Sequence, residues 1–108
     1  MTKHDLQGSL DLLVLKTLSQ RGTLHGYGIV LHIRAASHES LSIEEGSLYP
    51  ALHRMSQRKW IAAEWRVTET GRRAKYYQLT ALGRRRLAEA EGEFEQMVKG
   101  VRALLRHA

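Results

Sequence analysis

The chain has 108 residues and a formal net charge of +6 at pH 7, and it contains no cysteine. This length predicts a single domain with a modest core. Without cysteine, neither a disulfide framework nor a thiolate zinc site can form, which favours a reducing compartment. The longest run of leucine and valine covers only residues 12–15, too short for a membrane span, and residues 1–10 lack the layout of a signal peptide. We therefore expect a cytoplasmic protein.

The positive charge is concentrated in one part of the chain. Residues 54–86 contain ten basic and two acidic side chains, a net charge of +8, whereas the rest of the chain carries −2. Charge added only for solubility would be spread along the chain. The clustering therefore favours nucleic-acid binding.

The first two predicted helices supply core residues. Leucine and valine at helical spacing predict a helix over about residues 7–20, ending before Gly22, with Leu10, Leu13, Val14 and Leu18 in the core. A short helix then follows residues 24–28 (LHGYG), with Ile29, Val30 and Ile33 facing inward. The two glycines at its start leave backbone amides open to an anion such as a phosphate, and Tyr27 either bonds that phosphate or packs. Residues 35–41 are predicted to form a turn.

Residues 42–59 (SIEEGSLYPALHRMSQRK) are predicted to form the helix around which the rest is organised. Ser42 and Glu45 form a Ser-x-x-Glu capping box at its start. Leu48, Leu52 and Met55 mark the face that packs on the core. The opposite face carries small residues first and polar or basic residues later: Gly46, Pro50, His53, Arg54 and Gln57, flanked by Ser47 and Tyr49. Such a face suits close approach to a large anion, and the alternative is an ordinary solvated surface helix.

Residues 60–80 predict a β-hairpin. Alternation over residues 60–67 predicts a half-buried strand with Ile61, Ala63, Trp65 and Val67 on one face. Residues 74–80 form the second strand, and the turn at residues 68–73 contains Gly71 and places Arg72, Arg73 and Lys75 at the hairpin tip. Three helices followed by a basic-tipped hairpin match the winged helix-turn-helix layout. In that layout the third helix enters the DNA major groove and the hairpin touches the backbone or the minor groove.

Thr80 can cap a last helix over residues 81–106. Its apolar residues recur with the 3-4 spacing of a coiled coil: Leu87, Ala90, Phe94, Met97, Val101 and Leu104. A helix of this length, about 39 Å, is longer than a small core covers. A second copy of the helix is the simplest partner, and the alternative is that the helix folds back on its own domain. We expect an α+β, mostly α fold, with a winged helix-turn-helix DNA-binding domain at residues 1–80 and a dimerisation helix at residues 81–108.

Three ordered motifs also carry a resemblance to a known family: residues 24–29 (LHGYGI), 45–54 (EGSLYPALHR) and 71–80 (GRRAKYYQLT). Over about residues 6–87 the chain resembles the PadR family of bacterial transcriptional regulators, in its short branch with one C-terminal helix. The resemblance implies a winged-helix homodimer that binds a roughly palindromic DNA operator and usually represses its target genes. It leaves open release from the operator by a small-molecule inducer.

The resemblance implies roles for individual residues. Ser47, Tyr49 and Pro50 face DNA in the recognition helix, with Gly46, His53 and Arg54 beside them. Arg72, Arg73 and Lys75 of the wing contact phosphates or the minor groove. Lys59 and Trp60 stand where the family usually has a glycine and a smaller apolar residue, which leaves the turn into the first strand open to change. The last helix lacks the tryptophan on which some short-branch members stack flat drugs.

Other kinds of chemistry find little support in the sequence. The six histidines, His4, His25, His32, His38, His53 and His107, are scattered and form no pair with metal-ligand spacing. There is no glycine-rich phosphate loop after a strand, no cysteine nucleophile and no evident carboxylate dyad. We therefore expect no enzyme activity, cofactor or metal. The alternative to a DNA-binding regulator is a winged-helix module that binds protein or RNA.

Overall fold

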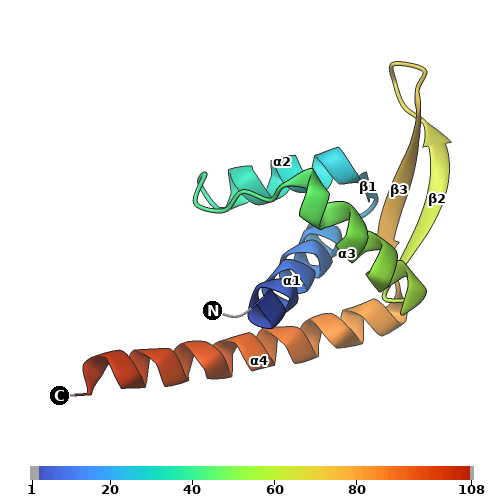
Figure 1. Ribbon diagram of the computed structural model, residues 1–108. Coiled ribbons are helices and arrows are strands. Elements are labelled where there is room, and N and C mark those ends of the chain that lie inside the picture. Colours follow the sequence, from blue (N-terminus) through green and yellow to red (C-terminus); the bar gives the residue numbers. More distant parts are fainter. Residues whose placement is uncertain (1–2, 108) are drawn as a thin grey trace.

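The computed structural model describes residues 3–107, with side chains from Ser9 onwards, and shows a mostly helical chain with one small sheet (Figure 1). The elements are α1 (Lys3–Arg21), β1 (Leu24–His25), α2 (Gly26–Ala36), α3 (Glu45–Gln57), β2 (Ile61–Val67), β3 (Arg73–Leu79) and α4 (Ala81–Arg106). The sheet is antiparallel with strand order β1–β3–β2. The expected winged-helix fold, α+β and mostly α, is confirmed.

Helices α1, α2 and α3 enclose the core. Each contributes one apolar face, because its leucine, isoleucine and valine residues recur every three or four positions. The fully or nearly fully buried apolar side chains of these helices are Val14, Leu15, Leu18, Ile29, Val30, Ile33, Leu48, Ala51, Leu52 and Met55. Helix α1 ends as predicted, because Gly22 has a φ of 80° and its amide donates to the Leu18 carbonyl at 3.0 Å. The inward positions predicted for α2 are also confirmed.

The start of α3 differs from the sequence prediction. The helix begins at Glu45 after an extended Glu44, and no side chain makes a capping hydrogen bond there. The expected capping box of Ser42 and Glu45 is therefore wrong. Ile43 packs against the core, so the chain still runs extended at the position where the predicted helix would already have begun. Placing the start at Glu45 leaves the predicted inner stripe unchanged.

The hairpin of β2 and β3 is less buried than its alternating sequence predicted. Ile61 is buried on β2, but Trp65 is 59% exposed and Val67 is 69% exposed. The prediction of a half-buried β2 is therefore wrong beyond its first residue. The physical reason is visible in Figure 1, where the two strands extend past the helices and no second layer covers their far half. The short strand β1, which the sequence did not suggest, pairs with Tyr76 and Tyr77 in the middle of β3.

Helix α4 joins this domain through a tightly packed turn. Thr80 caps it as predicted, because its hydroxyl accepts the Gly83 amide at 2.9 Å. Gly83 packs on the backbone of Trp60 so closely that a Cβ there would lie 1.9 Å from the Trp60 carbonyl oxygen. Lys59, which precedes this contact, has a φ of 63°. This lysine therefore keeps the left-handed conformation that glycine favours, at a cost of about 1 kcal/mol.

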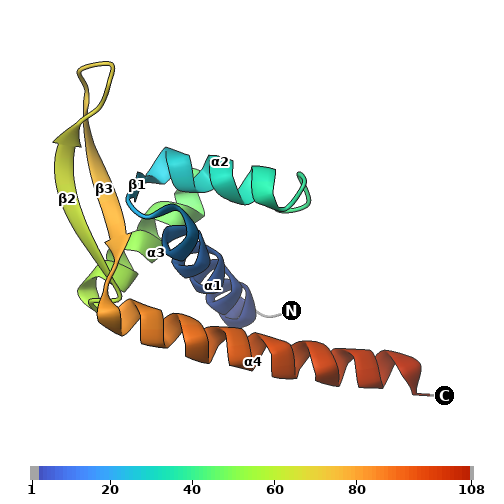
Figure 2. The same ribbon diagram turned by 180° about the vertical axis from the view of Figure 1, so that it is seen from behind.

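The two halves of α4 differ in their surroundings. Leu87 and Ala90 are buried against the rest of the chain, and Lys16 of α1 forms an ion pair with Glu91 at 3.2 Å. Beyond this point α4 runs past the domain into open space, as the view from behind shows (Figure 2). The fold-back alternative thus describes only the first half of the helix.

Candidate nucleic-acid interface

The outer face of α3 is exposed along its first three turns. Gly46, Ser47, Pro50 and His53 are exposed, and Tyr49 is 46% exposed. A Cβ added at Gly46 would meet no atom of the chain within 4 Å, so this part of the helix leaves room for an external surface. The structure therefore places these five predicted DNA-facing residues on one accessible face.

Tyr49 ties the start of α3 to the start of α2. Its ring packs on Gly26, where a Cβ would lie 2.9 Å from the Tyr49 hydroxyl oxygen. Only glycine permits this approach without a shift of the ring. Tyr27 follows directly and is 54% exposed, so two tyrosines of neighbouring helix starts lie at the same end of the molecule.

The amides at the start of α2 are not all open, contrary to the sequence prediction. His25 caps this helix, because its Nδ1 accepts the Gly28 amide at 3.0 Å. The ring of His25 also meets Tyr76 of β3 edge-on, with 5.3 Å between the ring centroids. The Gly28 amide is therefore already satisfied, whereas the Tyr27 side chain at the same helix start is exposed.

The wing consists of β2, β3 and the turn between them. Thr68 closes the turn, since its amide donates to the Arg72 carbonyl at 2.7 Å, and Gly71 has the expected positive φ, at 84°. Arg72, Arg73 and Lys75 are exposed at or near the tip. Within residues 9–107 none of these three cations has an acidic partner within ion-pair distance. Their charge is therefore free to meet an anion.

Trp65 is a surface residue that the sequence prediction placed on the inner face. It pairs across the hairpin with Lys75, and the guanidinium of Arg73 lies 5.2 Å and the ammonium of Lys75 6.0 Å from its ring centroid. These are cation–π distances. The hairpin register could have suggested the contact, because directly opposed residues share a face of the sheet. Trp65 therefore holds two wing cations close to one exposed ring.

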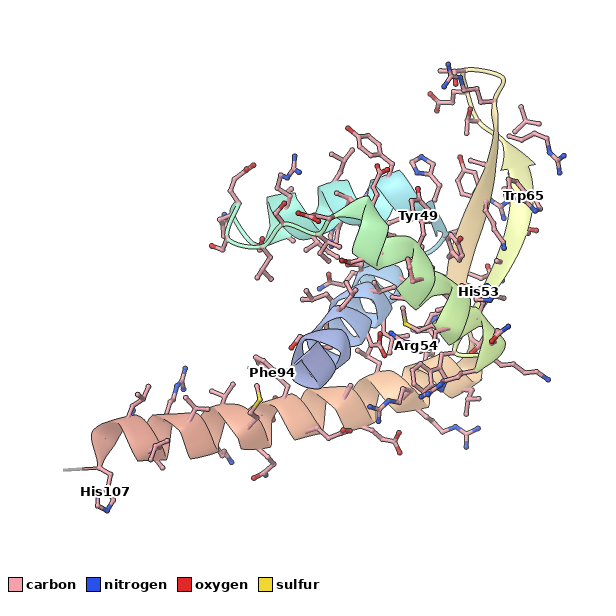
Figure 3. The ribbon with its side chains drawn as sticks, in the orientation of Figure 1. Tyr49, His53, Arg54, Trp65, Phe94 and His107 are labelled. Atoms are coloured by element: carbon pink, nitrogen blue, oxygen red, sulfur yellow. The ribbon has the colours of Figure 1, made fainter. Side chains whose placement is uncertain are left out.

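A groove of about 890 Å³ separates the wing from the starts of α2 and α3. Most of the aromatic and charged side chains that line it are aromatic or basic, including Tyr27, Tyr49, Trp65, Arg72, Arg73 and Lys75, and one, Glu69, is acidic. Figure 3 shows Tyr49 on α3 and Trp65 on the wing, on elements that flank this space. Tyr77 lies deeper, and burial, with a smaller contribution from Tyr49, raises the pKa of its hydroxyl above 10.0. Tyr77 is therefore neutral at physiological pH, and the groove's net charge comes mainly from the wing cations.

Arg54 does not lie on the outer face where the sequence placed it. Its two terminal nitrogens donate to the two carboxylate oxygens of Asp11 in α1, at 2.9 and 2.8 Å. Both side chains are largely covered, with 24% of Arg54 and 14% of Asp11 exposed. Helical spacing alone did not place Arg54 correctly, because a long side chain at the edge of the outer face can turn toward solvent or toward a neighbouring helix. Arg54 therefore joins α3 to α1 and does not extend the exposed basic surface.

The predicted seam of α4 is shorter than its sequence pattern. Leu87 and Ala90 face the chain's own core, which corrects the expectation that they are available to a second copy. Phe94, Met97 and Val101 are 44%, 43% and 47% exposed, and Leu104 is 74% exposed. Within the described part of the chain, no helix is long and apolar enough to cross a membrane. No group of three or more metal-ligand side chains occurs among the same residues.

Comparison with known proteins agrees with this arrangement. The family model described as the transcriptional regulator PadR-like family matches residues 14–89. A transcriptional regulator from Clostridium thermocellum is 26% identical, with a TM-score of 0.84 over 98% of this chain and 99% of that one. A PadR family regulator from Eggerthella lenta is 31% identical, with a TM-score of 0.78 over 96% and 88% of the two chains. A PadR-like regulator from Bacillus cereus is 27% identical, with a TM-score of 0.77 over 98% and 100%. With most of its length matched, the chain belongs to the PadR-like family of transcriptional regulators.

Proposed function

We propose that this regulator binds a specific double-stranded DNA operator through the outer face of α3 and the wing. The observation that carries the proposal is the groove in which exposed Tyr49 and Tyr27 face the unpaired cations Arg72, Arg73 and Lys75. A duplex that places the first turns of α3 in its major groove brings a phosphate strand to this groove and the wing tip toward the neighbouring minor groove. Ser47, Pro50 and His53 then face base edges.

The protein acts as a homodimer in this proposal. The four apolar side chains of the stripe, Phe94, Met97, Val101 and Leu104, are each at least 43% exposed. A contiguous exposed stripe of this kind is typical of an interface. Pairing two copies through α4 presents two recognition helices to one duplex, so residues 1–80 read the DNA and residues 81–108 set the spacing. Half-sites about 34 Å apart, one DNA turn, are the expected consequence.

The consequence for gene control is repression. A dimer seated on a roughly palindromic operator near a promoter blocks access of the transcription machinery to it. A small molecule that changes the relative positions of the two recognition helices would release the dimer. The protein works in the cytoplasm, where its DNA target lies.

The proposal is tested by fluorescence anisotropy with labelled duplexes tiled across the region upstream of the protein's own gene, at two salt concentrations and against a random duplex. We expect one tile to bind at least about a thousandfold more tightly than random DNA. Equal, salt-sensitive binding to every tile would contradict operator recognition there. Absence of binding to any duplex at low salt would overturn the proposal and favour a protein- or RNA-binding module.

A further inference from the structure

A second cationic cluster lies where α3 ends and α4 begins. We call it the base cluster, and it consists of Arg58, Trp60, Leu82, Arg85, Arg86 and Glu89, which line a concave site of about 450 Å³. This is within the size range of small-molecule sites. The base cluster contains no residue assigned above to the DNA face.

Trp60 organises the base cluster as Trp65 organises the wing. The guanidinium of Arg58 lies 5.2 Å and that of Arg86 5.4 Å from the Trp60 ring centroid. Because two guanidinium groups border the Trp60 ring, a ligand bound beside it meets their N–H groups. The guanidinium fork suits a carboxylate or another oxyanion, to which it can donate two parallel hydrogen bonds.

The charges of the cluster are unevenly compensated. Arg86 forms ion pairs with Glu93 at 3.0 Å and with Glu89 at 3.5 Å, so its charge is neutralised by glutamates of α4 itself. Its pKa is raised, because the hydrogen bonds and charges of these glutamates outweigh the lowering effect of burial. Arg58 and Arg85 have no acidic partner among the described side chains. Two uncompensated cations therefore line a site whose other walls include the indole of Trp60 and Leu82.

The site lies away from the wing tip and from the apolar stripe of α4. Trp60 precedes the seven residues of β2, so the wing tip is roughly 20 Å away at about 3.3 Å per residue. Arg85 and Phe94 are nine residues apart on α4, which at 3.6 residues per turn puts them on opposite sides of the helix. A second copy seated on the apolar stripe therefore leaves the base cluster accessible.

We propose that the base cluster binds a small amphiphilic oxyanion, a molecule with one carboxylate-type head and a short apolar body. Arg58 and Arg85 bind the head, and Leu82 and the edge of Trp60 contact the body. The site also lies where α3 is connected to α4. Arg58 is the C-cap residue of α3, and the hydroxyl of Thr80, the N-cap residue of α4, donates to the Lys59 carbonyl at 2.6 Å. Occupancy there can change the angle between α3 and α4. This regulatory part rests on the DNA-binding function proposed above, whereas the binding itself does not.

Binding is tested on the full chain carrying Trp65→Phe, so that Trp60 is the only tryptophan and its emission reports on the base cluster. Hexanoate is the probe, hexanamide is its neutral counterpart and inorganic phosphate is an oxyanion without an apolar body. We expect a saturable change of Trp60 emission with hexanoate and a dissociation constant at least tenfold higher for the other two. Combined Arg58→Ala and Arg85→Ala substitutions should raise the hexanoate dissociation constant at least tenfold. The matched control Arg34→Ala, an exposed arginine of α2, should change it less than twofold.

The outcomes separate the binding site from the function. Equal responses to hexanoate and hexanamide, equal responses to hexanoate and phosphate, or an unchanged constant in the double variant would overturn the site. For the regulatory part, saturating hexanoate should weaken operator binding by the protein with both tryptophans at least threefold and leave the double variant unaffected. An unchanged operator affinity with hexanoate bound would overturn the coupling alone. Failure of all DNA binding would contradict the proposed function and leave the emission assay intact.

Discussion

The wing and the base cluster are built from the same parts and face different surroundings. In each, a tryptophan holds two cations, Arg73 and Lys75 around Trp65 in the wing, and Arg58 and Arg86 around Trp60 in the base cluster. The wing projects from the domain and borders an open groove beside the exposed start of α3. The base cluster sits against the start of α4, where two glutamates neutralise Arg86.

The difference shows that clustering along the sequence does not equal clustering in space. The basic region of residues 54–86 is one block in the sequence, but the hairpin folds it into two groups at opposite ends of β2 and β3, while Arg54 is paired with Asp11. Only the group at the wing lies beside the exposed start of α3, which we propose to be the recognition helix. We therefore expect substitutions in the two groups to affect different measurements.

The largest effect is expected from Val101→Glu, because it places a charge in the middle of the exposed stripe of α4. An unpaired buried carboxylate in an interface costs several kcal/mol, so the dimer should dissociate at micromolar concentration. Sedimentation velocity would show a monomer, and operator affinity should fall by more than about a hundredfold, because each copy then binds one half-site. Hexanoate binding at the base cluster should change less than twofold. A dimer that persists in this variant would refute the proposed seam.

The next effect is expected from combined Arg72→Ala and Arg73→Ala substitutions. Loss of two phosphate contacts should lower the affinity for specific and random duplex alike and reduce the slope of log affinity against log salt by about 1.8. Titrations at several salt concentrations measure this slope. The matched control is Arg58→Ala with Arg85→Ala, which removes the same charge from the base cluster. If the control reduced the slope as much as the wing variant, the proposal that only the wing group contacts DNA phosphates would be wrong.

A smaller effect separates the two tryptophans. Trp60→Ala should destabilise the fold by about 2 kcal/mol, because this side chain is partly buried and packs against the core. Trp65→Ala should leave thermal stability nearly unchanged, because the ring is exposed. It should weaken DNA binding severalfold, because Arg73 and Lys75 lose the ring that holds them in place. Thermal unfolding combined with anisotropy checks both statements. Equal losses of stability in the two variants would contradict this contrast.

Much of this arrangement could be predicted from the sequence. Helical spacing identified the inner faces of α2 and α3 and part of that of α1, where it missed the fully buried Leu15. Gly22, Gly71 and Thr80 marked two turns and a helix start, because these signals are local and depend on backbone chemistry. The order of helices and hairpin then gave the fold class. The three motifs pointed to the family that the comparison confirms.

The rest could not be predicted, because it depends on distances between segments. Alternation made β2 look half-buried, yet burial requires a second layer, and none covers Trp65. The Ser-x-x-Glu pattern fitted a capping box, yet the helix begins only at Glu45, and Ile43 before it packs against the core. Arg54 was predicted on the exposed face of α3, but it binds Asp11 of α1, a residue 43 positions away in the sequence that only the fold brings close.

Arg54 gives the last contrast, in which stability should change and the salt slope of DNA binding should not. Arg54→Ala leaves the carboxylate of Asp11 largely covered and without its partner, so we expect a loss of stability of about 1–3 kcal/mol. Combining it with Asp11→Ala removes the stranded charge and should restore part of that loss, which a double-mutant cycle of unfolding free energies measures. Because Arg54 faces α1, the salt slope of DNA binding should stay within error of the unmodified protein in both variants. A slope lowered by about 0.9 would instead mean that Arg54 leaves Asp11 to contact a phosphate when DNA is bound.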